Sequence, residues 1–349
     1  MLPRSSSPWR PAAGLFAQAL DSFLNSASKL QIITTVDPRA EHVGNSKHGL
    51  PEPLPPRTRT QTLLVLDSSF NPPTRAHLQI AVSAVRDLMQ TRRRNLDTVR
   101  LLLLLSVNNA DKAAKPAAFE KRLAMMWAFA GDVQRDLLSM GASKDGLDEG
   151  RQTNTAEADA ISVDIGLATA PYFHEKSAAL VEGGFYNGES AGLDEAPAET
   201  EQVFLVGYDT LIRILNPKYY TSPPPLTSAG GSGLPTRGAI PTAMQDALDP
   251  FFTRAKLRVT MRTGDEWGEV EEQNAYIHDL LNGEGLGKAG GRRDWGARFE
   301  IVEGRKVDGD IVSSTYARSA SRERDWDKLD LMVTPDVRWL IEQEGLYNE

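Results

Sequence analysis

The sequence predicts an α/β protein with a doubly wound parallel sheet and helices on both of its faces. From Leu63 to the end of the chain, short apolar runs alternate with segments whose apolar residues recur at helical spacing. This alternation is typical of parallel sheets with crossover helices. The run Val99–Val107 is almost continuously apolar, as a central strand buried on both faces requires. With 349 residues, the chain is long enough to form one large domain of this class.

Strands and helices are expected in alternation along the chain. Each predicted strand is a short apolar run, and each predicted helix repeats apolar residues every three or four positions. The predicted strands are Leu63–Leu66, Val99–Val107, Ala160–Ile165, Val203–Val206, Lys256–Met261 and Phe299–Val302. The predicted helices are Leu15–Leu24, His77–Gln90, Ala118–Ala130, His174–Val181, Thr210–Leu215, Glu266–Leu281, one that begins near Ser313, and Pro335–Glu344.

The chain is expected to contain a single folded domain with an N-terminal extension. Residues 1–60 are interpreted as an N-terminal helix and a linker arm, because the sequence from residue 37 onward is rich in Pro, Arg, His and Gly. Residues 61–349 form the predicted domain. Three stretches within it lack apolar periodicity and are predicted to be disordered insertions: 141–159, 183–202 and 221–241.

The composition excludes several classes of function. A net charge of −8 argues against a nucleic-acid partner, and the absence of cysteine excludes disulfides and cysteine-based zinc sites. The longest apolar run, Leu101–Leu105, is too short to span a membrane. A cytoplasmic or nuclear location is favoured over a mitochondrial one, because the N-terminal segment has few arginines and contains Asp21. The sequence identifies no protein partner.

One strand-to-helix turn carries the strongest signal for ligand binding. After the strand Leu63–Leu66, a polar turn that includes Ser68, Ser69 and Thr74 leads into a helix headed by His77. Backbone N–H groups at a helix N-terminus and the positive end of its dipole bind anions. The Thr74 hydroxyl and the His77 ring are expected to reach the same anion, which favours a phosphate site. A plain helix start is the structural alternative.

A second segment with similar chemistry lies near the C-terminus. Residues 311–318 read IVSSTYAR and open another predicted helix. Ser314 and Thr315 place hydroxyl groups at its N-terminus, and Arg318 lies one turn further along the same face. Helix capping also explains the serine and threonine residues. Two anion sites in one chain indicate a substrate with several phosphates.

Two shorter segments follow predicted strands. Gly207 and Asp209 come after Val203–Val206, and Lys112 comes after Val99–Val107. Ligands bind at the carboxyl ends of strands in open α/β sheets, so these residues are further candidates. Asp209 is suited to cap a helix, or to contact a ribose or a metal-bound water. The structural alternative for Lys112 is a solvated surface side chain.

The two phosphate motifs together resemble those of a known enzyme superfamily. SFNPPTRAH (residues 69–77) resembles the first signature of the nucleotidylyltransferases, and VSSTYAR (312–318) resembles their second, I-S-S-T-x-x-R. FLVGYD (204–209) and MVTPDVRWLIEQEGLY (332–347) resemble further segments of nicotinamide mononucleotide adenylyltransferases. The chain looks closest to a divergent fungal branch of that family. The resemblance covers most of residues 60–130, 160–220 and 250–349.

This resemblance implies a Rossmann-like fold of the nucleotidylyltransferase type. It also implies adenylyl transfer from ATP to nicotinamide mononucleotide, which gives NAD and pyrophosphate. No covalent enzyme intermediate is implied, so catalysis is expected to rest on positioning and charge stabilisation. Mg²⁺ is the implied cofactor and is expected to accompany ATP through phosphate oxygens and water, without a protein metal site.

The implied site residues are those at positions that match the family motifs. The expected catalytic residues are His77, Thr74 and Lys112. The residues expected to contact ATP are His77, Gly207, Asp209, Ser314, Thr315 and Arg318. The residues expected to contact the mononucleotide are Ser68, Ser69, Phe70, Lys112, Tyr172 and Phe173.

Two positions depart from the family pattern. Ser68 replaces the glycine that opens the first motif, where a side chain hinders close backbone approach. The family's V-D-x-W-E segment, whose tryptophan stacks on the pyridine ring, reads VDIG at residues 163–166, so Tyr172 or Phe173 is the expected replacement ring. Three alternatives stay open: another acceptor such as nicotinate mononucleotide, another nucleotide donor, and a nucleotide-binding or ATP-hydrolysing protein that acts through protein partners.

Overall fold

The computed structural model describes nine segments of the chain, which group into two compact units. Unit 1 comprises Met1–Leu205 and Val307–Glu349, and unit 2 comprises Val206–Lys306. The expected division into an arm and a single domain stays a prediction. The described residues are 9–39, 52–91, 96–108, 117–142, 161–188, 199–220, 241–261, 270–304 and 312–348.

The sheet of unit 1 is mostly parallel, with the strand order β1-β4-β3-β2-β5. β4, β3, β2 and β5 are parallel, whereas β1 lies antiparallel to β4. The predicted α/β class with a parallel sheet is confirmed. The strands are β1 (Leu30–Val36), β2 (Thr62–Asp67), β3 (Val99–Ser106), β4 (Ser162–Ala168) and β5 (Glu201–Gly207).

The order of the strands reverses at β2. β3 and then β4 lie on one side of β2, and β5 pairs with its other side. Doubly wound sheets bind ligands outside the carboxyl ends of their strands at such a switch point. The turn that follows Asp67 therefore begins where this class of fold places its ligands.

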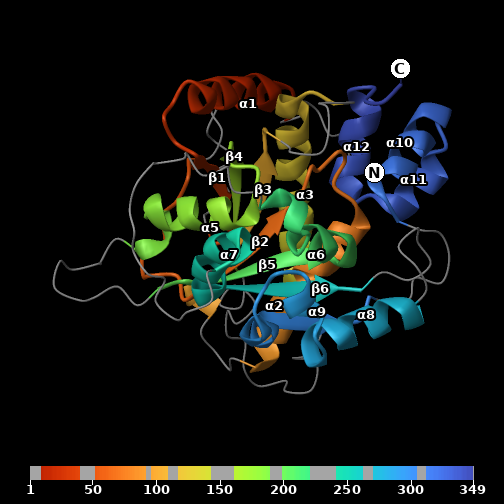
Figure 1. Cartoon of the computed structure of the whole chain (residues 1–349). Helices are drawn as coiled ribbons and strands as arrows, with labels where there is room; N and C mark the ends of the chain where they lie inside the picture. Colours follow the sequence, from red (N-terminus) through yellow and green to blue (C-terminus); the bar gives the residue numbers. More distant parts are fainter. Residues whose placement is uncertain are drawn as a thin grey trace, which may run out of the picture. The chain divides into compact units, whose positions relative to one another are not determined.

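Helices cover both faces of this sheet, as Figure 1 shows. On one face, Leu101, Leu103 and Leu105 of β3 join the apolar core formed with α1, α2, α3, α10, α11 and α12. Alternate strand residues point to the other face, where Phe173 of α5 packs against Phe204 of β5. The helices of unit 1 are α1 (Trp9–Leu24), α2 (Arg75–Thr91), α3 (Phe119–Ala142), α5 (Phe173–Glu182), α10 (Ser314–Glu323), α11 (Trp326–Met332) and α12 (Pro335–Gln343).

Unit 2 is built around a parallel strand pair, β6 (Ala255–Thr260) and β7 (Phe299–Val302). Phe252, at the end of α7, packs against Trp295 and Phe299 with ring centroids 5.0 and 5.5 Å apart. The sequence analysis missed α7, because Pro250 interrupts its helical pattern. The described helices of unit 2 are α6 (Tyr208–Ile214), α7 (Ala243–Arg254), α8 (Val270–Asn282) and α9 (Gly285–Lys288).

Strand β1 lies in the segment expected to hold only a helix and a linker arm. The two adjacent threonines Thr34 and Thr35 made this segment look like a loop in the sequence. In the structure both are buried within the strand. The Thr35 hydroxyl is satisfied by donating to Asp164 Oδ1 at 2.7 Å. A register shift between Ile32 and Thr34 also interrupts the two-residue alternation that marks a strand.

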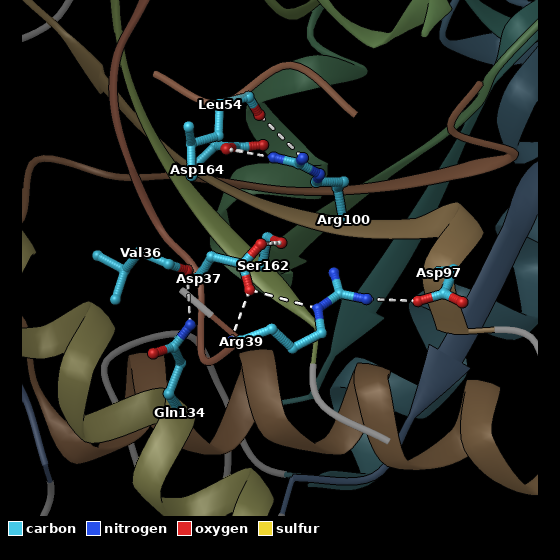
Figure 2. Close-up of polar contacts among 9 residues, drawn as sticks. All are labelled: Val36, Asp37, Arg39, Leu54, Asp97, Arg100, Gln134, Ser162 and Asp164. Atoms are coloured by element: carbon cyan, nitrogen blue, oxygen red, sulfur yellow. Dashed lines mark hydrogen bonds and ion pairs between the residues drawn. The ribbon is translucent and has the colours of Figure 1, made fainter. Parts of the chain in front are cut away.

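A buried polar network joins β1, β3 and β4 at the amino ends of the parallel strands (Figure 2). Arg100 Nη1 lies 2.9 Å from Asp164 Oδ1, and Arg100 Nη2 donates to the backbone oxygen of Leu54 at 2.9 Å. The Leu54 N–H donates to the Thr35 hydroxyl at 2.9 Å. Burial raises the pKa of Asp164, whereas Arg100 lowers it. The network therefore fastens residue 54 to the sheet at the edge opposite the β2 turn.

The three predicted insertions differ in how far the structure describes them. Residues 141–159 and 221–241 lie outside the described residues, apart from the end of α3 and Pro241. The stretch 183–202 differs from the prediction at both ends, where a short 3₁₀-helix (Phe185–Asn187) and the start of β5 are ordered. Tyr186 is buried in that helix, and its backbone oxygen accepts from Thr60 N–H at 3.0 Å. No helix among the described residues has the length and apolarity to cross a membrane.

Candidate functional site

The first turn of α2 holds His77 in one defined orientation. Thr74 N–H donates to His77 Nδ1 at 3.0 Å, and the Thr74 hydroxyl lies 2.8 Å from the same nitrogen. A backbone N–H only donates, so Nδ1 is the acceptor and the neutral ring carries its proton on Nε2. This Nε2–H points at the Ser68 hydroxyl, which lies 2.9 Å away. Thr74 thus fixes the tautomer in which the outward nitrogen of His77 donates.

The N-terminus of α10 lies against the same turn. The Ser314 hydroxyl donates to the backbone oxygen of Pro72 at 2.8 Å. Arg318 Nη1 donates to the backbone oxygen of Asn71 at 2.8 Å, and Arg318 Nη2 donates to the Thr315 hydroxyl at 3.1 Å. The two motifs found in the sequence therefore form one site within unit 1.

Two guanidinium groups beside this turn lack an acidic partner. Arg318 is half-buried, and Arg122 of α3 is only 6% exposed. Arg122 Nε donates to the backbone oxygen of Ala117 at 2.7 Å. Within the described part of the chain, no carboxylate pairs with Arg122 or Arg318. Burial and neighbouring arginines lower the pKa of both groups, so an anion bound here would relieve this repulsion.

A buried ion pair at the end of β2 was missed by the sequence analysis. Lys176 of α5 forms an ion pair with Asp67, and the two side chains are 4% and 7% exposed. The Ser106 hydroxyl lies 3.4 Å from the other Asp67 oxygen. Lysine in a helical pattern is usually a solvated side chain, so the pattern around residue 176 gave no signal. The pair anchors α5 directly beside the start of the site.

Ser69 and Phe70 have opposite environments. Ser69 is exposed, whereas the Phe70 side chain is fully buried and lies 5.4 Å from the His77 ring and 6.4 Å from the Phe129 ring. Phe70 has a φ of 43°, a left-handed conformation that costs a non-glycine residue about 1–2 kcal/mol. Only the backbone of Phe70 is therefore available to a ligand, and the expected contact of this residue with the mononucleotide stays a prediction.

Tyr172 and Phe173 are engaged with other side chains. The Tyr172 ring stacks on His174 at 5.7 Å. Phe173 packs against Phe204 at 5.6 Å, and the Lys176 ammonium lies 5.1 Å from the Phe173 ring centre. Both rings are partly exposed, but no described contact joins either of them to His77. Their expected contact with the mononucleotide stays a prediction.

The structure explains why the family's tryptophan is absent at Gly166. A Cβ atom built on this glycine would lie 3.1 Å from Leu102 Cδ1, 3.2 Å from Ile32 Cδ1 and 3.3 Å from Leu104 Cδ1. Ile32 belongs to β1, the strand that the sequence analysis missed. Side chains of both β3 and β1 therefore crowd the space beside residue 166, and a larger side chain there would require them to shift.

Three of the expected site residues lie elsewhere. Gly207 and Asp209 belong to unit 2, where Gly207 precedes α6 and Asp209 forms an ion pair with Arg213. Lys112 lies outside the described residues. Their expected contacts with adenosine and with the mononucleotide phosphate stay predictions. Among the described residues, no group of three or more His, Asp or Glu side chains is placed to hold a metal ion.

A protein of similar sequence points to the same phosphate chemistry as the geometry of this site. No family model matches the chain. A protein of Schizosaccharomyces pombe named "Putative nicotinamide mononucleotide adenylyltransferase" is 28% identical over 258 residues, which cover 74% of this chain and 75% of that protein. The chain thus resembles this relative along about three quarters of each sequence.

Solved structures similar to this chain include two of nicotinic acid mononucleotide adenylyltransferase from Plasmodium falciparum. One is a complex with NaAD, with a TM-score of 0.39 and 11% identity over 82% of this chain and 98% of that one. The other is a complex with APC, with a TM-score of 0.39 and 10% identity over the same shares of the two chains.

Proposed function

We propose that this protein transfers the adenylyl group of ATP to nicotinamide mononucleotide, forming NAD and releasing pyrophosphate. The observation that supports this most strongly is the site in unit 1 where His77 and Arg318 lie beside one turn, contributed by two distant segments. This site offers hydrogen-bond donors and positive charge with no acidic partner among the described residues. The name of the Schizosaccharomyces pombe relative supports the same reaction.

In the proposed reaction, a phosphate oxygen of the mononucleotide attacks the α-phosphorus of ATP. A new P–O bond forms, the bond from the α-phosphorus to the bridging oxygen breaks, and its electron pair leaves on pyrophosphate. Negative charge builds on the non-bridging oxygens in the transition state. The Nε2–H of His77 donates to these oxygens, and Thr74 holds the ring so that this nitrogen keeps its proton.

The α10 residues are proposed to bind the β- and γ-phosphates. Arg318 and the Thr315 hydroxyl share one face at the N-terminus of α10, where backbone N–H groups and the helix dipole also favour anions. Lys112 is proposed to meet the mononucleotide phosphate. Gly207 and Asp209 are proposed to contact the adenosine.

Mg²⁺ is proposed to enter with ATP, where it neutralises charge on the transferring phosphates. The donors on this site's described residues are hydroxyl, imidazole and guanidinium groups, which suit phosphate better than a hard cation. The residues thus fit a metal held by phosphate oxygens and water. Ser314, Thr315 and Arg318 orient the triphosphate that carries it.

Nicotinate mononucleotide is the alternative acceptor. Nothing on the described residues of unit 1 distinguishes a carboxylate from an amide on the pyridine ring. A second candidate function, nucleotide binding or ATP hydrolysis that serves a protein partner, is favoured by one observation: the Ser68 hydroxyl already occupies the Nε2–H of His77. The two functions differ in their products, which are a dinucleotide with pyrophosphate or ADP with phosphate.

The test is product analysis with the purified full-length protein. The protein is incubated with MgATP and either nicotinamide or nicotinate mononucleotide, and the products are separated by chromatography. We expect NAD and pyrophosphate in equal amounts from nicotinamide mononucleotide, and the parallel reaction shows whether nicotinate mononucleotide is also an acceptor. Replacement of His77 by alanine is expected to lower kcat about 100- to 1000-fold, as loss of a charge-stabilising donor does.

A matched control is His278→Ala, since His278 is exposed on α8 in unit 2. This variant is expected to keep wild-type turnover. Circular dichroism checks that both variants fold. ADP formation without dinucleotide from the wild type would support the second function instead. Wild-type turnover by His77→Ala would show that His77 only starts a helix.

A further inference from the structure

We propose that Tyr347, in the C-terminal tail, is a positioning residue that holds Asn71 so that Arg318 is aimed at the polyphosphate of the substrate. This inference rests on the proposed function and gives a role to a residue that is not among the expected site residues. Tyr347 follows α12 and lies far from the β2 turn in sequence. In the fold, its side chain reaches under that turn.

Asn71 is held by hydrogen bonds at both of its polar ends. The Tyr347 hydroxyl donates to Asn71 Oδ1 at 2.8 Å, while the Asn71 backbone oxygen accepts from Arg318 Nη1 at 2.8 Å. Asn71 is 4% exposed and Tyr347 is 9% exposed, so water does not replace either bond. The chain of contacts therefore runs from the tail, through one buried amide residue, to the guanidinium.

The Tyr347 hydroxyl lies between two positive charges and still keeps its proton. Arg122 and Arg318 both act to lower the pKa of Tyr347, but burial raises it above the ordinary value. The sulfur of Met125 lies 3.8 Å from the hydroxyl oxygen. At neutral pH the hydroxyl is thus a donor to Asn71, and its lack of charge leaves the two arginines available to an anion.

The backbone is strained on both sides of this contact. Tyr347 has a φ of 68°, and Phe70, next to Asn71, has a φ of 43°. Left-handed conformations of non-glycine residues persist only where the surrounding structure enforces them, and they occur often at functional sites. The tail is also fixed by the Ser321 hydroxyl of α10, which donates to the Leu346 backbone oxygen at 2.8 Å. Tyr347 therefore ties α10 and the β2 turn together.

The substitution Tyr347→Phe tests this role, because it removes the donor and keeps the ring. Asn71 Oδ1 then loses the Tyr347 donor while it stays buried, which is unfavourable and allows Asn71 to turn. Binding of MgATP and of inorganic pyrophosphate is measured by calorimetry, and KM for MgATP and kcat are measured by product analysis. We expect Kd and KM to rise about 5- to 30-fold, with a smaller change in kcat.

Two further variants separate positioning from a general loss of stability. Tyr316→Phe is the matched control, since the exposed Tyr316 hydroxyl on α10 makes no contact with the described residues; it is expected to bind as the wild type does. In an Arg318→Ala background, Tyr347→Phe is expected to weaken binding less than twofold further, because Tyr347 acts through Arg318.

Unchanged pyrophosphate affinity in Tyr347→Phe would overturn the inference. An equal, additive loss in the Arg318→Ala background would also overturn it, since the tyrosine would then act independently of the arginine. The calorimetric comparison does not depend on turnover. A wild type that binds pyrophosphate but forms no dinucleotide would contradict the proposed function alone, whereas one that binds neither ligand would contradict both.

Discussion

His77 and Ser68 form the contact on which the chemistry of the site depends most. The Nε2–H of His77 is the donor that the proposed transition state needs, and Ser68 holds it at 2.9 Å. A substrate phosphate must therefore replace the serine hydroxyl as the acceptor. At this position the family pattern has glycine, which has no side chain to compete.

Replacing Ser68 by glycine is accordingly expected to raise activity. Removal of one competing hydrogen bond frees the His77 donor, and an ordinary hydrogen bond is worth about 0.5–1.5 kcal/mol, or about 2- to 10-fold in kcat/KM for ATP. Steady-state kinetics on the wild type and on Ser68→Gly measure this change. A loss of activity in Ser68→Gly would indicate that the serine assists His77.

The sequence motifs identified the residues of this contact, but they did not determine its geometry. Thr74, His77 and Arg318 were found because each stands at a fixed offset within a short motif. Their hydrogen bonds to Asn71 and Ser68 depend on backbone direction in the turn, including the left-handed Phe70. Local spacing does not encode such a conformation in a residue other than glycine.

At the scale of elements, the ends of the predicted strands agree with those of β2 to β7 to within about three residues, as apolar runs allow. Strand β1 was missed, since its buried threonines and register shift conceal the pattern. The apposition of α10 and the β2 turn also has no local signal, because it is a tertiary contact. The family resemblance led us to expect that these two segments lie together, whereas the spacing of apolar residues gave no indication of it.

The network at the other end of the sheet gives a prediction about stability. Arg100→Met leaves Asp164 buried without its cation, which is expected to lower the free energy of unfolding by about 3–5 kcal/mol at pH 8. Chemical denaturation measures this change. Arg39→Met is the control, because Arg39 pairs with the exposed Asp97 and such a pair contributes about 0–1 kcal/mol.

The loss in the free energy of unfolding that Arg100→Met causes is expected to become smaller as the pH falls. Burial raises the pKa of Asp164 from 3.8, and removal of Arg100 takes away the charge that lowers it. Between the unfolded and the raised folded pKa, the folded variant binds more protons than the unfolded chain, so its stability falls as pH rises. An equal loss at pH 5 and pH 8 would show that Asp164 does not carry the penalty.

At the scale of the whole molecule, a positive site is set in an acidic protein. The net charge is −8, yet the described residues around the β2 turn include two arginines without acidic partners. The two arginines favour an anion at the proposed site, while the overall charge opposes binding to nucleic acid. Strand β1 completes this unit by filling the space beside Gly166, which a sequence pattern alone does not indicate.

Nucleotide binding is expected to stabilise the folded protein as a whole. A ligand at 100 times its Kd adds about 2.7 kcal/mol to the free energy of unfolding. Thermal unfolding with and without MgATP should show a higher Tm for the wild type. Arg318→Ala should show a smaller rise at the same concentration, because the guanidinium no longer binds the phosphates. Equal rises in the two proteins would place the nucleotide elsewhere.

The most direct measurement of adenylyl transfer follows the phosphates of ATP by isotope. The purified protein is given nicotinamide mononucleotide with MgATP labelled at the α-phosphate, and in parallel with MgATP labelled at the γ-phosphate. We predict that the α-label appears in NAD and the γ-label in pyrophosphate, and that His77→Ala loses both signals together. Release of the γ-label as inorganic phosphate, with the α-label left in ADP, would contradict the proposed reaction.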